Sequence, residues 1–271
     1  MKSSLYLIIA LALFLRPFAL LAETGNLFFS MHYGNASSSG PFEMNEFYDP
    51  SSSIAVELGY RLNDYFAIVP VHVAFHNYSF NQAAYAENYQ NYQAQYRAQL
   101  WEKAWEQYSE INVSNNPFEP AAVEASSNLE SVAYTPGVVL HTPRIAGFNA
   151  FGQFGAGIYS TKVSMEHIVK SVNIYDPSQV SYGSYREKTR ISHFALLFGG
   201  GLEYFPKDFA GIFFRVSYYR VFTGRKSNPE LGYQVLKFYR LDNETLRYHR
   251  FLEEKDTGIL ELSAGFKILM Y

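Results

Sequence analysis

Charged side chains recur inside segments of the chain that otherwise alternate large apolar residues with small ones. The set comprises three carboxylates and three cations: Glu57, Arg61, Glu203, Arg215, Glu261 and Lys267. An isolated charge is costly in a dry interior, so these groups should pair with one another. The interpretation we favour is a structural ionic network that plugs an enclosed space. The alternative is a gated polar path for small solutes.

Three histidines, His32, His76 and His193, fall in phase with these charges near one end of their segments. Histidine is the commonest metal ligand, so a metal or catalytic cluster is one interpretation. We favour three unrelated polar residues that line a wet mouth, because their segments are not neighbours. His72 shares a face with His76 but lies about 13 Å away along an extended chain, too far for a common ion. We therefore predict neither a metal site nor a cofactor.

Eight extended segments position these residues, each alternating with a period of two. They are residues 27–33, 54–61, 65–78, 132–141, 151–159, 192–204, 212–222 and 259–271. One face of each segment is large and apolar. The other face holds the charges together with glycines such as Gly59, Gly155 and Gly201. Glycine suits the interior of an eight-stranded barrel, which is only just wide enough for side chains, better than it suits a water-facing surface.

The connections between these segments alternate strictly in length. Short connections cover residues 62–64, 142–148 and 205–208, and long ones cover 34–53, 79–131, 161–191 and 223–258. Short periplasmic turns and long extracellular loops alternate in this way in up-and-down membrane barrels. The fold class we predict is therefore all-β, an eight-stranded antiparallel up-and-down transmembrane β-barrel.

The second long loop interrupts the period of two with a helical pattern. Within an insertion at residues 81–130, a helix is expected over about 82–110. Its aromatic stripe consists of Tyr85, Tyr89, Tyr92, Tyr96, Trp101 and Trp105. Tyrosine and tryptophan dominate binding hot spots, so the stripe could contact an extracellular partner. The alternative is that the stripe packs against other loops of the same barrel.

The first residues predict a signal peptide at 1–22, with Lys2, an apolar run at 5–21 and a small residue, Ala22, before the cleavage point. The barrel would then comprise residues 23–271. Without Lys2 and Arg16, 20 basic residues face 25 acidic ones, which argues against a nucleic-acid binder. The aromatic content of 18% fits a barrel ringed at two water–lipid boundaries.

Three stretches resemble the OmpA/OmpX-type outer-membrane barrels, including their opacity-protein-like and OmpW-like relatives. They are ELGYRLND at residues 57–64, FGQFGAGIY at 151–159 and GGGLEY at 199–204. The resemblance extends as a pattern over most of the mature chain, and its motifs specify a fold and not an activity. It implies a bacterial outer-membrane location in contact with outer-membrane lipid.

Enzymatic barrels of this size include lipid A acylases and deacylases, whose serine and histidine must lie within hydrogen-bond reach. Here His76 and the nearby Ser79 sit on opposite strand faces, and the deacylase-like histidine followed two residues later by Ser-Asn is absent. We therefore expect a non-catalytic structural or surface-interaction protein. A narrow channel for small or apolar solutes is the second hypothesis, and an outer-leaflet lipid A-modifying enzyme is the third.

Overall fold

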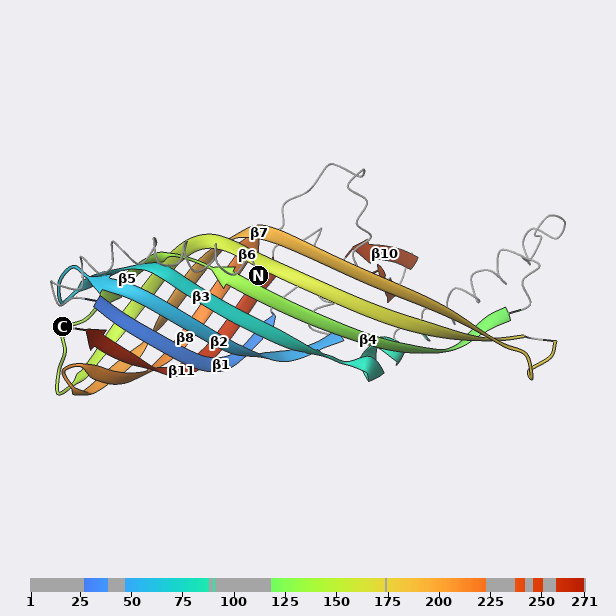
Figure 1. The fold of residues 1–271 in the computed structure, drawn as a ribbon, viewed down its shortest axis with the longest axis horizontal. Coiled ribbons are helices and arrows are strands. Elements are labelled where there is room, and N and C mark those ends of the chain that lie inside the picture. The colour runs from blue at the N-terminus through green and yellow to red at the C-terminus, as the bar shows by residue number, and fades with distance from the viewer. Residues whose placement is uncertain are drawn as a thin grey trace, which may run out of the picture.

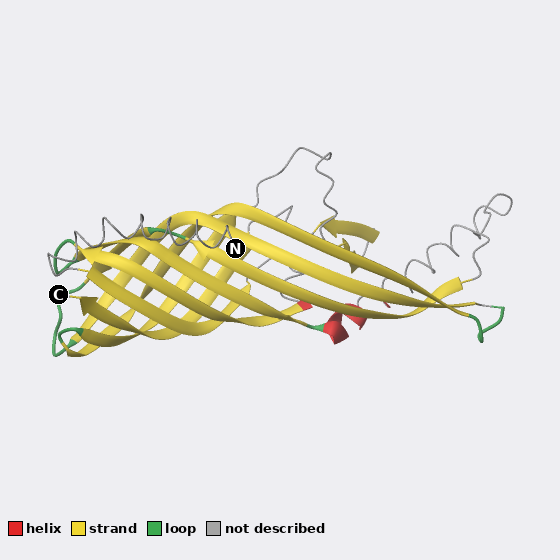
Figure 2. Cartoon of the chain, in the orientation of Figure 1, coloured by secondary structure: helices red, strands yellow, loops and turns green. Residues whose placement is uncertain are grey.

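The computed structural model describes residues 27–38, 47–87, 90, 118–173, 175–222, 237–241, 246–250 and 257–270, and strands dominate it (Figures 1 and 2). The predicted signal peptide lies outside these residues. The barrel strands are β1 Leu27–Ser38, β2 Tyr48–Arg61, β3 Phe66–Phe80, β4 Phe118–Tyr134, β5 Gly137–His141, β6 Phe148–Asn173, β7 Val180–Lys207, β8 Ala210–Phe222 and β11 Thr257–Met270. A short separate hairpin consists of β9 Lys237–Leu241 and β10 Leu246–Arg250.

The barrel strands form one closed antiparallel sheet. Its order is β2-β1-β11-β8-β7-β6-β4-β3-β5, and the additional pairing of β2 with β3 closes the ring. Because β4 and β5 both lie between β3 and β6, these nine strands occupy eight positions in the wall. The predicted eight-stranded antiparallel barrel is confirmed. None of the helices among the described residues has the length and apolar character needed to span a bilayer.

Side-chain alternation separates an apolar exterior from a polar and small-residue interior. On β8, Ile212, Phe214 and Val216 are exposed while Phe213 and Arg215 between them are buried. The apolar set predicted for the last strand likewise faces outward, from Leu260 to Met270 in steps of two. Successive residues of a strand point to opposite faces, so the sequence alternation directly becomes an inside and an outside.

Along β6 the apolar side chains change from the outward face to the inward face. Phe154 and Ile158 face outward, but beyond them Val163 and Met165 are buried inside the barrel wall while Lys162 faces out. Apolar residues therefore face lipid as far as Ile158, and they face the protein interior in the part of the strand that contains Val163 and Met165. The reversal places the outer edge of the lipid-facing apolar band just after Ile158.

The predicted long loop at residues 161–191 is largely strand, and the predicted loop at residues 79–131 ends in strand, which corrects the sequence interpretation. β6 continues to Asn173 and β7 begins at Val180, and every residue from Phe148 to Val172 has a partner on β7. β4 likewise begins at Phe118, within the predicted loop. Figure 1 shows these three strands extending well beyond the rest of the barrel. We call residues 118–131, 160–173 and 180–192 the outer projection. Its strands escaped detection because most of their described outward residues are polar.

The predicted strand 132–141 is interrupted at Thr135 and Pro136, which separate β4 from β5. Opposite this break, three residues of β3 face two of the fourth wall strand, because Val73 pairs with Tyr134 and Val69 pairs with Gly137. Pro136 has no amide hydrogen for the ladder, and the extra β3 residue makes a bulge. The Tyr134 hydroxyl donates a hydrogen bond of 3.0 Å to the carbonyl of Pro70 within this bulge.

The described start of the predicted loop helix, residues 82–87, is helical. Its Tyr85 is only 5% exposed and packs against Phe47 and Phe80, with 5.6 Å between ring centroids in both cases. Tyr85 is thus part of a core cluster, and its assignment to an exposed contact stripe was wrong. The remaining stripe residues lie outside the described residues: Tyr89, Tyr92, Tyr96, Trp101 and Trp105.

Candidate functional site

Glu57 on β2 is the centre of a hydrogen-bonded cluster inside the barrel. Ser30 donates to its Oε2 at 2.7 Å, and Arg215 donates to its Oε1 at 2.8 Å. His72 and Gln153 contact the same Oε1 at 2.8 and 2.9 Å. These groups come from β1, β8, β3 and β6, which lie on different sides of the barrel. Glu57 is 1% exposed, so the carboxylate exchanges water for four protein partners.

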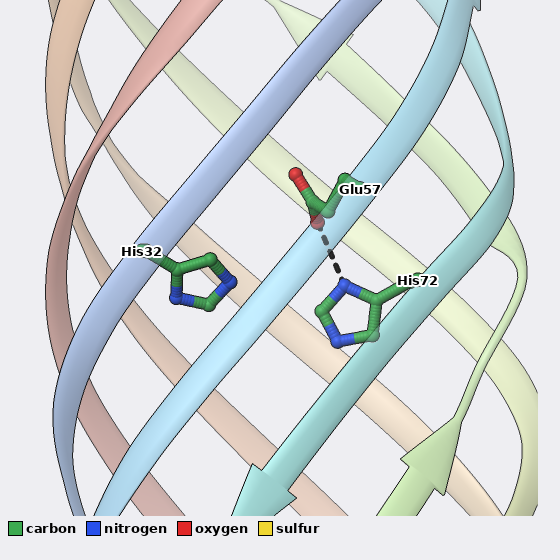
Figure 3. Close-up of side chains that lie close together, drawn as sticks. All are labelled: His32, Glu57 and His72. Carbon is green, nitrogen blue, oxygen red and sulfur yellow. Dashed lines mark hydrogen bonds and ion pairs between the residues drawn. The ribbon is translucent and has the colours of Figure 1, made fainter.

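The ligand atoms of His32, Glu57 and His72 lie within 4.8 Å of one another, a grouping that could hold a metal ion (Figure 3). Arg215 already occupies this grouping. Its Nη1 donates to His32 Nε2 at 3.1 Å, and its Nη2 donates to Glu57. The guanidinium supplies positive charge where a metal would, so the geometry fits a hydrogen-bonded cluster better than a metal centre.

A second carboxylate, Glu261 on β11, joins two of the histidines that the sequence singled out. His32 Nδ1 lies 3.3 Å from Glu261 Oε1, and His76 Nε2 lies 3.1 Å from Glu261 Oε2. Both histidines are 1% exposed. The interpretation of these two as unrelated residues lining a wet mouth was therefore wrong. Strands that are not neighbours in the wall still meet across so narrow a lumen. His193 is half-buried farther out on β7.

Two inward tyrosines complete this cluster, and the sequence interpretation did not identify them. The Tyr219 hydroxyl lies 2.9 Å from His72 Nε2, and the Tyr159 hydroxyl lies 2.9 Å from His76 Nδ1. When the imidazole is neutral and its proton lies on the nitrogen that faces the carboxylate, the tyrosine donates to the other nitrogen. Alternation was the available signal, since both residues share a face with small or polar neighbours. We call the whole cluster the polar network: Ser30, His32, Glu57, His72, His76, Gln153, Tyr159, Arg215, Tyr219, Glu261 and Ser263.

The network contains the residue types of an acyl-transfer triad in Ser263, His32 and Glu261. Ser263 Oγ lies 2.9 Å from His32 Nδ1, and Glu261 Oε1 lies 3.3 Å from the same nitrogen. A triad needs its serine on one imidazole nitrogen and its carboxylate on the other. Here Arg215 occupies the second nitrogen. The arrangement does not have the geometry of an activated nucleophile.

A separate ion pair joins Glu203 to Lys267 toward the end of the barrel with the short turns. Asn149 donates to the other carboxylate oxygen of Glu203 at 3.1 Å, and His141 Nδ1 lies 3.5 Å from it. The six predicted charges thus divide into Glu57 with Arg215, Glu203 with Lys267, and Glu261 with histidines. Arg61 is half-buried and takes part in no ion pair among the described residues.

Apolar clusters fill the lumen on both sides of the polar network. One, toward the short turns, contains Phe28, Ala67, Val69, Val139, Phe151, Phe205, Phe213 and Leu269. The other includes inward residues of the outer projection and contains Phe47, Tyr48, Tyr78, Tyr85, Val123, Leu129, Val163 and Met165. The fit is close at Gly59, where an added Cβ would come within 2.2 Å of the Phe28 ring. Buried apolar side chains therefore pack inside the barrel on both sides of the polar network.

The exterior decides where such a barrel resides. On the neighbouring strands β8, β7 and β11, the large apolar side chains of Phe214, Leu202 and Leu262 are 67%, 61% and 57% exposed. Water disfavours a continuous apolar belt of this kind, whereas lipid requires it, and a closed barrel leaves no edge of unpaired backbone groups in the bilayer. The protein is an outer-membrane β-barrel.

Comparisons with known proteins find only distant structural matches. No family model and no curated protein sequence matches the chain. The solved structure of Ail, the attachment invasion locus protein of Yersinia pestis, matches with 12% identity, a TM-score of 0.38, and coverage of 90% of this chain and 99% of Ail. Neisserial surface protein A matches with 10% identity, a TM-score of 0.38, and coverage of 90% and 96%. The Escherichia coli outer-membrane protease OmpT matches with 10% identity, a TM-score of 0.30, and coverage of 90% and 96%. These values are too low to carry residue roles between the chains.

Proposed function

We propose that this outer-membrane barrel is a non-catalytic surface-interaction protein whose outer projection makes the contact. The observation that carries the proposal is the length of β6 and β7 beyond the lipid-facing band. Residues 160–173 of β6 alone extend about 45 Å along the strand at roughly 3.3 Å per residue. A barrel that only had to span the membrane would not require this extension.

The tip of the β6–β7 hairpin has the character of a contact surface. Tyr175 is 83% exposed and Tyr182 is 67% exposed. Asn173 Oδ1 accepts the backbone N–H of Tyr175 at 2.9 Å, and Asp176 accepts both the backbone N–H and the hydroxyl of Ser178. These bonds order the turn backbone at Tyr175, and Tyr182 lies in β7, so both backbones are already ordered before binding. Tyrosines in such a position are typical of hot spots in binding surfaces.

The contents of the lumen favour this proposal over the alternative of a channel. Hydrogen bonds of the polar network cross from wall to wall, from β1 and β2 to β8 and from β3 to β11. Apolar clusters lie on either side of them. Ion or solute passage would require several buried bonds to break together. We therefore propose that the charges inside the barrel are structural.

The test replaces residues 164–188 with Asn-Gly. Val163 and Thr189 are paired in register, so a two-residue turn can join them. We expect the shortened protein to assemble in the membrane, because the removed residues lie beyond the lipid-facing band. Adherence of intact cells to other cells and to surfaces should fall to that of cells lacking the protein. Full adherence by a correctly assembled variant would contradict the proposal.

A point-mutant version keeps the hairpin intact. The double variant Tyr175→Ala/Tyr182→Ala should reduce adherence, whereas Tyr65→Ala, an exposed tyrosine at a short turn, should not. The purified wild-type barrel should give no steady conductance in planar bilayers. Steady single-channel currents would favour the channel instead. Changed acylation of lipid A in cells that produce the protein would favour the enzyme.

A further inference from the structure

The exterior of the outer projection carries a group of cations close to the lipid-facing band, which we call the basic face: Lys162, Arg186, Lys188 and Arg190. Lys162 on β6 pairs directly with Arg190 on β7, and Lys188 is the next residue on the same side of β7. Side chains directly opposite each other have Cβ atoms about 4.5–5.5 Å apart, and like charges there destabilise the strand pair. The strand register thus brings together charges that repel each other.

Carboxylates compensate only two of these cations. Lys162 donates to Glu130 at 3.1 Å, and Arg186 donates to Glu166 at 2.7 Å. The hydrogen bond from Lys162 lowers the pKa of Glu130 from its ordinary value, with help from Asn128. Both pairs lie on the solvent-exposed exterior.

The other two cations of the basic face have no carboxylate partner within the part of the chain that the structure describes. Lys188 and Arg190 are both exposed, and Arg190 donates through Nε to the hydroxyl of Ser160 at 3.2 Å. The planar guanidinium of Arg190 keeps its remaining N–H donors for another acceptor. An anion placed between Lys162, Lys188 and Arg190 would relieve the repulsion in the register.

The height of the basic face matches that of lipid headgroups. The series of outward apolar residues that faces lipid ends at Ile158 on β6 and at Phe194 on β7, each 54% exposed, and the next outward positions are Ser160 and Ser192. Lys162 follows Ile158 by four residues, which corresponds to roughly 10 Å of height on a strand tilted by about 40°. Beyond the band on the opposite wall, the described outward residues of β1, β2 and β3 include no cation: Asn35, Ser52, Asn77, and the acidic Asp49 farther out on β2. Among the described residues at this height, the cations therefore lie on one side of the barrel.

We propose that the basic face binds the phosphate groups of an anionic glycolipid of the outer leaflet. Arginine binds phosphate through parallel N–H bonds, and lysine adds a point charge. The lipid chains lie against Ile158 and Phe194, and the phosphates lie between the cations above them. This binding site is independent of the contact proposed for the hairpin tip, because it uses the base of the projection and faces the membrane.

The test titrates the detergent-purified full chain with diphosphorylated lipid A in neutral dodecylmaltoside micelles, with the rise in unfolding temperature as the readout. Each cation near an anionic membrane surface strengthens binding about fivefold, so Lys162→Gln/Lys188→Gln/Arg190→Gln should bind about a hundredfold more weakly. The control Lys207→Gln removes an exposed cation at the opposite end and should bind like wild type. Binding should also weaken as salt is added.

Equal affinity of the triple variant and the wild type for lipid A would overturn the proposal. An equal effect of inorganic phosphate at the same concentration would also overturn it, because the site would then take small anions and not a lipid. Should the triple variant fail to fold, Lys188→Gln alone carries the test, with an expected loss of about fivefold. The hairpin replacement removes Arg186 and Lys188 as well as the tip, so the double variant Tyr175→Ala/Tyr182→Ala, which leaves the basic face intact, is the variant whose adherence is separate from lipid A binding.

Discussion

Two arginine–glutamate pairs of nearly equal length occupy opposite environments in this barrel. Arg215 and Glu57 lie 2.8 Å apart in the interior, with side-chain exposures of 2% and 1%. Arg186 and Glu166 lie 2.7 Å apart on the outer projection, with exposures of 68% and 42%. Contact distance therefore does not distinguish them. The difference lies in the surroundings, because water can replace the partner on the exterior but not in the lumen.

The largest expected effect comes from removing one partner of each pair. Arg215→Leu leaves Glu57 as a buried carboxylate without its cation, which should cost about 3–5 kcal/mol in free energy of unfolding. Arg186→Leu leaves Glu166 in water and should change stability little. Urea unfolding of both variants in detergent, followed by circular dichroism, measures the difference. Equal midpoints would show that the buried pair contributes no more than the exposed one.

A smaller effect is expected from a neutral partner of the same network. Tyr219→Phe removes the donor to the second nitrogen of His72, and an unsatisfied buried group costs about 1–3 kcal/mol. The adjacent Tyr218→Phe is the matched control, because that side chain is on the exterior and 37% exposed. In the same urea titration, the unfolding midpoint of Tyr219→Phe should be lower than that of Tyr218→Phe. The reverse order would mean that the tyrosine hydroxyl in the lumen contributes little to stability.

The smallest effect tests a polar group that faces lipid. Tyr134→Phe removes the donor to the Pro70 carbonyl in the bulge, which should cost about 0.5–1.5 kcal/mol. Tyr33→Phe, another outward tyrosine, is the control and should be close to neutral. Unfolding in phospholipid vesicles is the appropriate measurement, since detergent admits water to the carbonyl. Equal stability of the two variants in vesicles would contradict this prediction and would mean that the Pro70 carbonyl has another hydrogen-bond partner.

The sequence predicted the wall of the barrel better than its contents. Alternation on β8 and β11 correctly separated Phe214 from Arg215 and Leu262 from Glu261, because a period of two is a local property of each strand. The meeting of His32 with His72 and of His76 with Glu261 depends on distances across the lumen. Reasoning from neighbouring strands could not supply these contacts.

The outer projection was missed for a different reason. The series of lipid-facing apolar residues on β6 ends at Ile158. Beyond it the alternation continues, but the apolar residues Val163 and Met165 lie on the inward face. The exchange was visible in the sequence and marks the membrane boundary. The break at Pro136 was also visible, but a single proline does not reveal whether a strand ends or bulges.

The uninterrupted register of β6 with β7 has a consequence for the order in which the barrel forms. These strands are joined by a short turn after Asn173, so their contacts are close in sequence and little chain entropy is lost when the turn closes. The seam between β1 and β11 instead joins Leu27 to Met270, across nearly the whole chain. Contacts between residues so far apart in the sequence form slowly, so the β6–β7 hairpin should be folded while the seam between β1 and β11 is still open. During that interval the unpaired backbone of β1 and β11 is the most vulnerable surface of the protein to pairing with another chain.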